Sequence, residues 1–271
     1  MYRGKWVYDE SFPLHNSLAC PSIRKEFDCL KYGHPDHFSL KFDGESFLKR
    51  FSGKKIMFIG DSLSLNIWQS LVCMLYAAVP NSNIIRQELN TTTISSVKFQ
   101  DSLYLVDVDG EKIGRVLNLN SMRNGNLWKN IDVLVFNTWL WWWDYIKVEG
   151  KIVKDMDRIV AFKTALTTWA KWVDSDVETD KTRVIFQGIS PSHYHGSDRG
   201  ELGVTNCLKE MRPFNGTIYP AGLPEAVYVV KEVISGIKKP VHLLDITALS
   251  QRRKDAHLHP LVCGWPYRYL E

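Results

Sequence analysis

Three consecutive residues, Gly60-Asp61-Ser62, have types and a position that suit acyl transfer by a serine nucleophile. They follow the apolar run 55–59, which predicts a strand buried on both faces, and precede apolar residues that recur at helical spacing over 63–75. A serine at such a turn exposes its hydroxyl, and the N–H groups at the helix start can hold a developing oxyanion. The alternative is structural, in which Asp61 or Ser62 only caps the helix.

Asn137 and the tryptophans that follow it are the second group of candidate site residues. Asn137 ends another apolar run, 131–136, where its amide can donate to an oxyanion or simply form a turn. The flat rings next to it suit stacking on sugar rings, and the alternative is packing in the core. This group comprises Trp139, Trp141, Trp142 and Trp143.

The elements that must position these residues alternate between strand and helix patterns. Because active sites of open α/β sheets form beyond the carboxyl ends of the strands, this order predicts a doubly wound α/β sheet with Ser62 and Asn137 at its catalytic edge. His193, His195, His242 and Asp245 lie near strand ends or in loops, and we expect surface or hydrogen-bonded core residues there. Strands are predicted at 55–59, 131–136, 183–187 and 241–245, helices at 63–75, 153–173 and 221–237, and a hairpin from 104–108 and 114–117 with its turn at Asp109-Gly110.

Bulk composition indicates one large globular domain without a nucleic-acid surface. The chain has 271 residues, of which 45% are hydrophobic, which is enough for a full core. Its net charge of +4 is spread without any long run of like charges. No apolar stretch reaches the ~18 residues of a membrane span, and residues 1–20 show no secretory signal.

Cysteines and sequons give information about the compartment and about metals. The five cysteines contain no Cys-x-x-Cys, which argues against a zinc site, and no metal is expected. Two sequons, at Asn90 and Asn215, would be glycosylated only in a secretory lumen.

An ordered set of short motifs resembles the trichome-birefringence-like proteins of plants, distant relatives of the GDSL/SGNH hydrolases. The Gly60-Asp61-Ser62 block belongs to this set, which runs over almost the whole chain. Its other members are Gly4-Lys5-Trp6-Val7-Tyr8-Asp9, Pro13-Leu14, Cys20-Pro21, Phe27-Asp28-Cys29, Phe136-Asn137-Thr138-Trp139, Phe186-Gln187-Gly188-Ile189-Ser190-Pro191, Asn206-Cys207, Leu244-Asp245-Ile246-Thr247 and Arg253-Lys254-Asp255-Ala256-His257.

The resemblance implies an SGNH-like α/β/α domain over 51–271, with an irregular N-terminal arm over 1–50 packed on it. It further implies an O-acetyltransferase of the Golgi lumen that acetylates wall polysaccharide, most commonly xylan. Ser62 would be the nucleophile, and its own N–H together with Asn137 would line the oxyanion hole. No cofactor is expected to be bound, and an acetyl donor derived from acetyl-CoA would be the co-substrate.

Departures from the family pattern lead to further expectations. The family's membrane anchor, an internal loop and the terminal Asp-Cys-Ser-His-Trp-Cys block, whose Asp and His activate the serine, are expected to be missing, so that activity is impaired. The alternatives are a non-catalytic polysaccharide-binding member and an acetylesterase that uses water as acceptor. By the same resemblance Cys20 is expected to pair with Cys73, while Cys29 and Cys207 would lack their usual partners.

Overall fold

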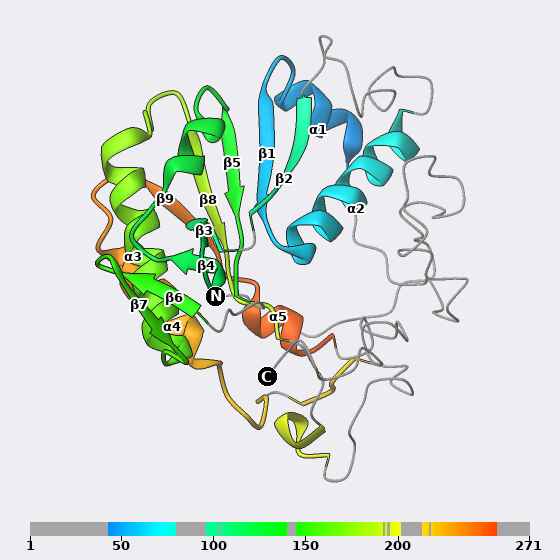
Figure 1. Cartoon of the computed structure of the whole chain (residues 1–271). Coiled ribbons are helices and arrows are strands. Elements are labelled where there is room, and N and C mark those ends of the chain that lie inside the picture. The colour runs from blue at the N-terminus through cyan, green and yellow to red at the C-terminus, as the bar shows by residue number, and fades with distance from the viewer. Residues whose placement is uncertain are drawn as a thin grey trace.

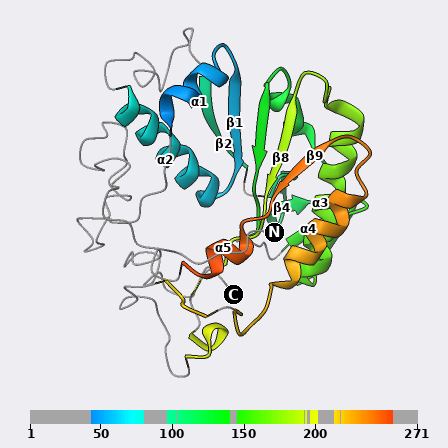
Figure 2. The same ribbon diagram turned by 180° about the vertical axis from the view of Figure 1, so that it is seen from behind.

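The computed structural model describes residues 43–79, 96–102, 104–139, 145–191, 193, 196–201, 213–216 and 218–253. Five parallel strands form the main sheet in the order β2-β1-β5-β8-β9, with helices on both faces (Figures 1 and 2). The predicted doubly wound α/β fold is confirmed. The strands are β1 (Lys55–Gly60), β2 (Ser96–Asp101), β5 (Val133–Phe136), β8 (Arg183–Gln187) and β9 (Val241–Leu244).

Alternate residues of the central strands point to opposite faces of the sheet, and both faces are buried. Ile56 and Phe58 of β1 pack with α1 (Gly44–Arg50) and α2 (Ser62–Ala78). Met57 and Ile59 join the cluster formed with α3 (Arg158–Asp176) and α4 (Glu225–Ser235). This double burial explains why the central strands read as unbroken apolar runs.

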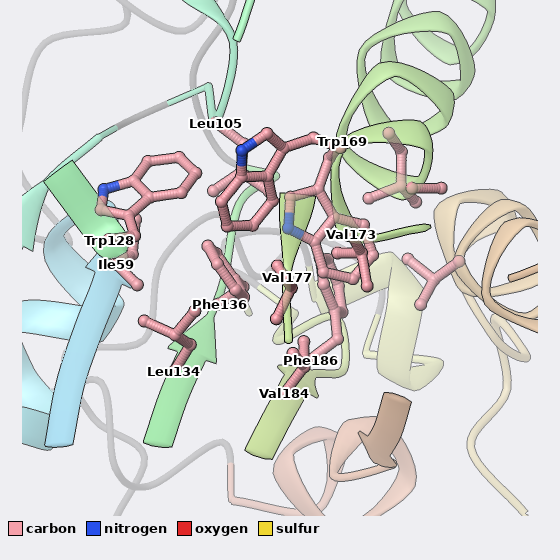
Figure 3. Close-up of a cluster of buried hydrophobic side chains, with 14 of the residues drawn as sticks. Ile59, Leu105, Trp128, Leu134, Phe136, Trp169, Val173, Val177, Val184 and Phe186 are labelled. Atoms are coloured by element: carbon pink, nitrogen blue, oxygen red, sulfur yellow. The ribbon is translucent and has the colours of Figure 1, made fainter. Parts of the chain in front are cut away.

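The larger core cluster is rich in aromatic side chains. Phe136 makes edge-on contacts with Trp128 and Trp169, at ring-centroid distances of 5.2 and 5.3 Å. Trp169 of α3 also contacts Phe186 of β8 at 5.2 Å, so that one helix covers two adjacent strands (Figure 3). Such pairs add about 0.5–1.5 kcal/mol each beyond their burial.

A smaller sheet, in the order β3-β4-β6-β7, is built from insertions on either side of β5. It packs against Ala161 and Ala165 of α3. Its strands are β3 (Asp107–Glu111), β4 (Gly114–Asn118), β6 (Tyr145–Val148) and β7 (Lys151–Lys154), and the 3-10 helix η4 (Arg123–Trp128) lies between β4 and β5.

Asp107, at the start of β3, fastens the small sheet to the chain that follows β4. The residue is 2% exposed, and its carboxylate accepts hydrogen bonds from Ser121 Oγ, from Arg123 N at 2.8 Å and Nε at 3.0 Å, and from Asn124 N at 3.2 Å. Burial raises the pKa of Asp107, but these hydrogen bonds outweigh it and hold the pKa below the ordinary value.

Two predicted elements differ from the structure. The hairpin is present, but its turn is at Lys112-Ile113, because Asp109 and Gly110 are paired across the ladder and the Asp109 carboxylate accepts from Asn118 Nδ2 at 2.7 Å. The helix predicted from residue 153 begins instead at Arg158, since Asp157 caps it by accepting from Val160 N at 2.9 Å. Residues 151–154 form β7.

Residues 44–50, at the end of the predicted arm, form the helix α1, whereas residues 1–42 lie outside the described residues. The division at 50/51 stays a prediction. None of the helices within the described ranges has the length and apolarity needed to cross a bilayer.

Candidate active site

Ser62 lies where β1 passes directly into α2. The carboxylate of Asp61 accepts a hydrogen bond from Leu63 N at 2.9 Å, so Asp61 is the residue that caps the helix. Asp61 is 1% exposed, whereas Ser62 is exposed at the first position of the helix. Within the described part of the chain the Ser62 hydroxyl makes no hydrogen bond. The nucleophile predicted from the sequence is therefore accessible and has no capping function.

Gly60 permits an unusually close approach between the ends of β1 and β5. A Cβ added at Gly60 would lie 2.2 Å from the backbone oxygen of Asn137 and 2.5 Å from Ser64 Oγ. Two backbone bonds hold the neighbouring segments there: Asn137 N donates to Ile59 O at 3.0 Å, and Ser102 N donates to Gly60 O at 3.1 Å. Only glycine fits this position without moving the chain next to Ser62.

Asn137 is buried, with 1% of its surface exposed, and directly follows the β5 residue that pairs with Ile59. Its Oδ1 atom has no hydrogen-bond partner among the described residues. This oxygen can accept a hydrogen bond from a substrate hydroxyl, since buried polar groups normally find a partner, whereas an oxyanion would need the Nδ2 donor of the same amide. Its predicted oxyanion role stays a prediction. One turn into α2, Asn66 carries a similar Oδ1 atom, which the sequence did not single out.

The strand order places Ser62 and Asn137 at the reversal point of the sheet. From β1 the chain passes first to β2 on one side and later to β5 on the other. The loops after β1 and β5 therefore diverge, and in open α/β sheets the crevice between such loops is where ligands bind. The topology thus supports the same location that the sequence motifs predicted.

Of the four tryptophans predicted to contact sugar, Trp139 is described, and Trp141, Trp142 and Trp143 lie outside the described residues. Trp139 is half-buried and meets Phe162 of α3 edge-on at 5.0 Å. The Arg158 guanidinium lies 4.1 Å from the centre of its ring, and Arg158 Nη2 donates to Trp139 O at 2.7 Å. Burial lowers the pKa of Arg158. These contacts fasten the segment after Asn137 to α3.

The histidines and Asp245 behave as expected where they are described. His242 is exposed on β9, and Asp245 forms an ion pair with Lys231 at 2.9 Å. His193 is 2% exposed, with Nε2 at 2.9 Å from Gln251 O, which identifies Nε2 as the protonated nitrogen. His195 lies outside the described residues.

A set of buried hydrogen bonds between the loop after β8 and α5 (Thr247–Gln251) was not predicted from the sequence. Thr247 Oγ1 donates to Ile189 O at 2.6 Å, and His193 bonds to Gln251 O. His193 has a φ of 59°, an uncommon conformation for a residue other than glycine. The two bonds hold the loop after β8 against α5.

A hollow of about 360 Å³ lies elsewhere in the described part of the chain. Its lining includes Asp132 and Thr182, which precede β5 and β8, so it opens at the amino ends of the strands, opposite Ser62. Groups of three or more side chains able to hold a metal ion are absent from the described residues.

Cys73 on α2 is buried, with 2% exposure, and is disulfide-bonded. Its partner lies outside the described residues, so the pairing with Cys20 stays a prediction.

Comparison with known proteins shows the family to which the chain belongs. Residues 40–266 match the model of the GDSL/SGNH-like acyl-esterase family found in Pmr5 and Cas1p, and residues 1–44 match the PMR5 N-terminal domain. The chain is 48% identical to protein trichome birefringence-like 38 of Arabidopsis thaliana, over 95% of this chain and 75% of that protein. It is 49% identical to protein trichome birefringence-like 41 of the same plant, over 97% and 81%. It is 32% identical to xylan O-acetyltransferase 6 of Oryza sativa subsp. japonica, over 95% of this chain and 54% of that protein. The chain therefore belongs to the GDSL/SGNH-like acyl-esterase family, within the trichome birefringence-like proteins.

Proposed function

We propose that this chain has the fold and nucleophile of an O-acetyltransferase that acts on a plant cell-wall polysaccharide, with xylan as the acceptor. The observation that carries the proposal is the exposed Ser62 hydroxyl at the reversal point of the sheet, beside the buried amide of Asn137. A relative at 32% identity is named a xylan O-acetyltransferase.

The proposed reaction has two acyl-transfer steps. Ser62 Oγ attacks the carbonyl carbon of the acetyl donor, its proton passes to a base, and the bond to the donor's leaving group breaks as that group takes up a proton. An acetyl ester on Ser62 results. A sugar hydroxyl then attacks this ester and gives its proton to the base, and the bond between the acetyl carbon and Ser62 Oγ breaks as Oγ takes up a proton. The Ser62 N–H and the Asn137 amide would stabilise the oxyanion in both steps.

The family takes its general base from an Asp-x-x-His block, and these residues do not contain that block. The 271 residues contain no Asp-x-x-His. His193 is engaged with Gln251 O and is buried in the contact between the β8 loop and α5. Because general-base assistance contributes about 10²–10⁴-fold, we propose that these residues alone have little transferase activity.

A transfer assay tests this proposal. The 271 residues and a fusion that carries the Asp-x-x-His block of a relative would be produced in a secretory host and incubated with an acetyl donor and a xylo-oligosaccharide. The fusion should acetylate the sugar at least 100-fold faster than the chain alone, consistent with the value of a base. Ser62→Ala in the fusion should abolish transfer while its stability stays within about 0.5 kcal/mol, since Asp61 provides the cap. Equal activity of the two proteins would contradict the proposed role of the block.

The same assay separates the alternatives. Release of free acetate without acetylated sugar would indicate an acetylesterase. Retained sugar binding without any acetyl ester on the protein would indicate a polysaccharide-binding member.

We further propose that the protein acts in the Golgi lumen, in keeping with the resemblance and with the disulfide at Cys73, since disulfides persist in oxidising compartments.

A further inference from the structure

Asn215 opens the sequon Asn215-Gly216-Thr217, and its side chain is exposed. The residue after it is glycine and not proline, as the acceptor motif requires. Residues 213–216 belong to neither a helix nor a strand. Among the described residues the Asn215 side chain has no hydrogen-bond partner, so its amide nitrogen is available for chemistry.

A backbone hydrogen bond and ring contacts hold the residues next to Asn215, whose own side chain lies on the surface. Phe214 N donates to Arg252 O at 2.7 Å, which ties the loop to the end of α5. The Phe214 ring meets that of Tyr219 edge-on at 5.4 Å. It also lies over Gly216, where an added Cβ would be 2.3 Å from the ring. Because the ring turns back onto Gly216 and Tyr219, the exposed Asn215 side chain is not covered by these described neighbours.

We propose that Asn215 carries an N-linked oligosaccharide. The chemistry is substitution at the anomeric carbon of a lipid-linked oligosaccharide by Asn215 Nδ2. The new carbon–nitrogen bond forms as the bond to the lipid pyrophosphate breaks, and the amide loses one proton. The reaction needs the secretory machinery, so the proposal rests on the luminal location proposed above and is independent of the acyl chemistry at Ser62.

The test uses the full 271-residue chain, directed into the endoplasmic reticulum of plant cells by an added signal peptide. Only chains protected from protease in sealed microsomes are analysed, so every chain measured has reached the lumen. Peptide N-glycosidase treatment in heavy-oxygen water, followed by mass spectrometry, reports conversion of each glycosylated asparagine to a labelled aspartate. Asn90 is read in the same digest as a second, independent sequon.

The label should appear at Asn215 in the wild type. Thr217→Ala should remove it and increase gel mobility by one glycan step, whereas the matched Thr217→Ser variant retains the sequon and the label. Asn215→Gln should have the same effect as Thr217→Ala. Protected chains that carry no label at Asn215 would overturn the proposal, whatever happens at Asn90. Neither result bears on acetyl transfer, so the two proposals fail separately.

Discussion

Replacing Gly60 with alanine should both destabilise the protein and disturb the candidate site. The added Cβ would lie 2.2 Å from the backbone oxygen of Asn137 and 2.5 Å from Ser64 Oγ. The Ser64 hydroxyl can rotate away, because its hydrogen bond to Ile59 O is long, at 3.5 Å. The Asn137 oxygen belongs to the backbone, whose N–H is bonded to Ile59 O at 3.0 Å, so the clash is relieved only by moving the end of β5.

The expected loss of stability has two contributions, the clash of the added methyl group and the loss of a backbone hydrogen bond. Forcing a methyl group into a packed site costs typically 1–3 kcal/mol, and losing a backbone hydrogen bond costs about 0.5–1.5 kcal/mol more. We therefore expect Gly60→Ala to lower the free energy of unfolding by about 2–4 kcal/mol. Because Asn137 moves with the strand end, acetyl ester formation in the fusion protein should also fall.

Urea unfolding, followed by circular dichroism, measures the stability change. Gly110→Ala is a matched control, because an added Cβ at Gly110 has no atom within 4 Å and should change stability by no more than about 0.5 kcal/mol. If Gly60→Ala unfolded at the same urea concentration as the wild type, the close approach of the two strand ends described above would be refuted.

Three further predictions concern other parts of the fold. Asp107→Asn should lower the free energy of unfolding by about 2–3 kcal/mol at neutral pH. Because the folded pKa of Asp107 lies below its ordinary 3.8, the wild type should lose this stability as the pH falls below about 4. Urea titrations over this pH range should show the loss in the wild type and not in the variant. His193→Ala should leave the Gln251 carbonyl without its donor and speed amide hydrogen exchange in α5, whereas His193→Gln, which keeps a donor, should restore part of the protection. Non-reducing peptide mapping should recover Cys20 linked to Cys73, and finding Cys20 as a free thiol would contradict the pairing.

Burial explains which strands the sequence predicts. Three central strands, β1, β5 and β8, are continuous apolar runs because helices cover both faces of the main sheet. The hairpin of β6 and β7 was missed, because all four residues of β7 are exposed and β6 is fixed by pairing with β4, a contact distant in sequence. Val153 was consequently assigned to the helix that begins at Arg158.

The candidate site was likewise predicted only in part. Ser62 and Asn137 were predicted because each directly follows a recognisable strand, and the end of a parallel strand is a position that sequence can locate. The contact between α5 and the loop after β8 was not predicted. Its acceptors are the backbone oxygens of Ile189 and Gln251, which every residue type possesses, so no side-chain pattern reveals them.

Trapping the acyl-enzyme determines whether Ser62 accepts the acetyl group. The fusion protein would be incubated with an isotopically labelled acetyl donor in the absence of sugar, quenched in acid and mapped by mass spectrometry. One labelled acetyl ester should form, on the peptide containing Ser62; it should disappear when a xylo-oligosaccharide is added and never form in Ser62→Ala. Label that transfers to the sugar equally well in Ser62→Ala, or that resides reproducibly on another residue, would contradict this prediction.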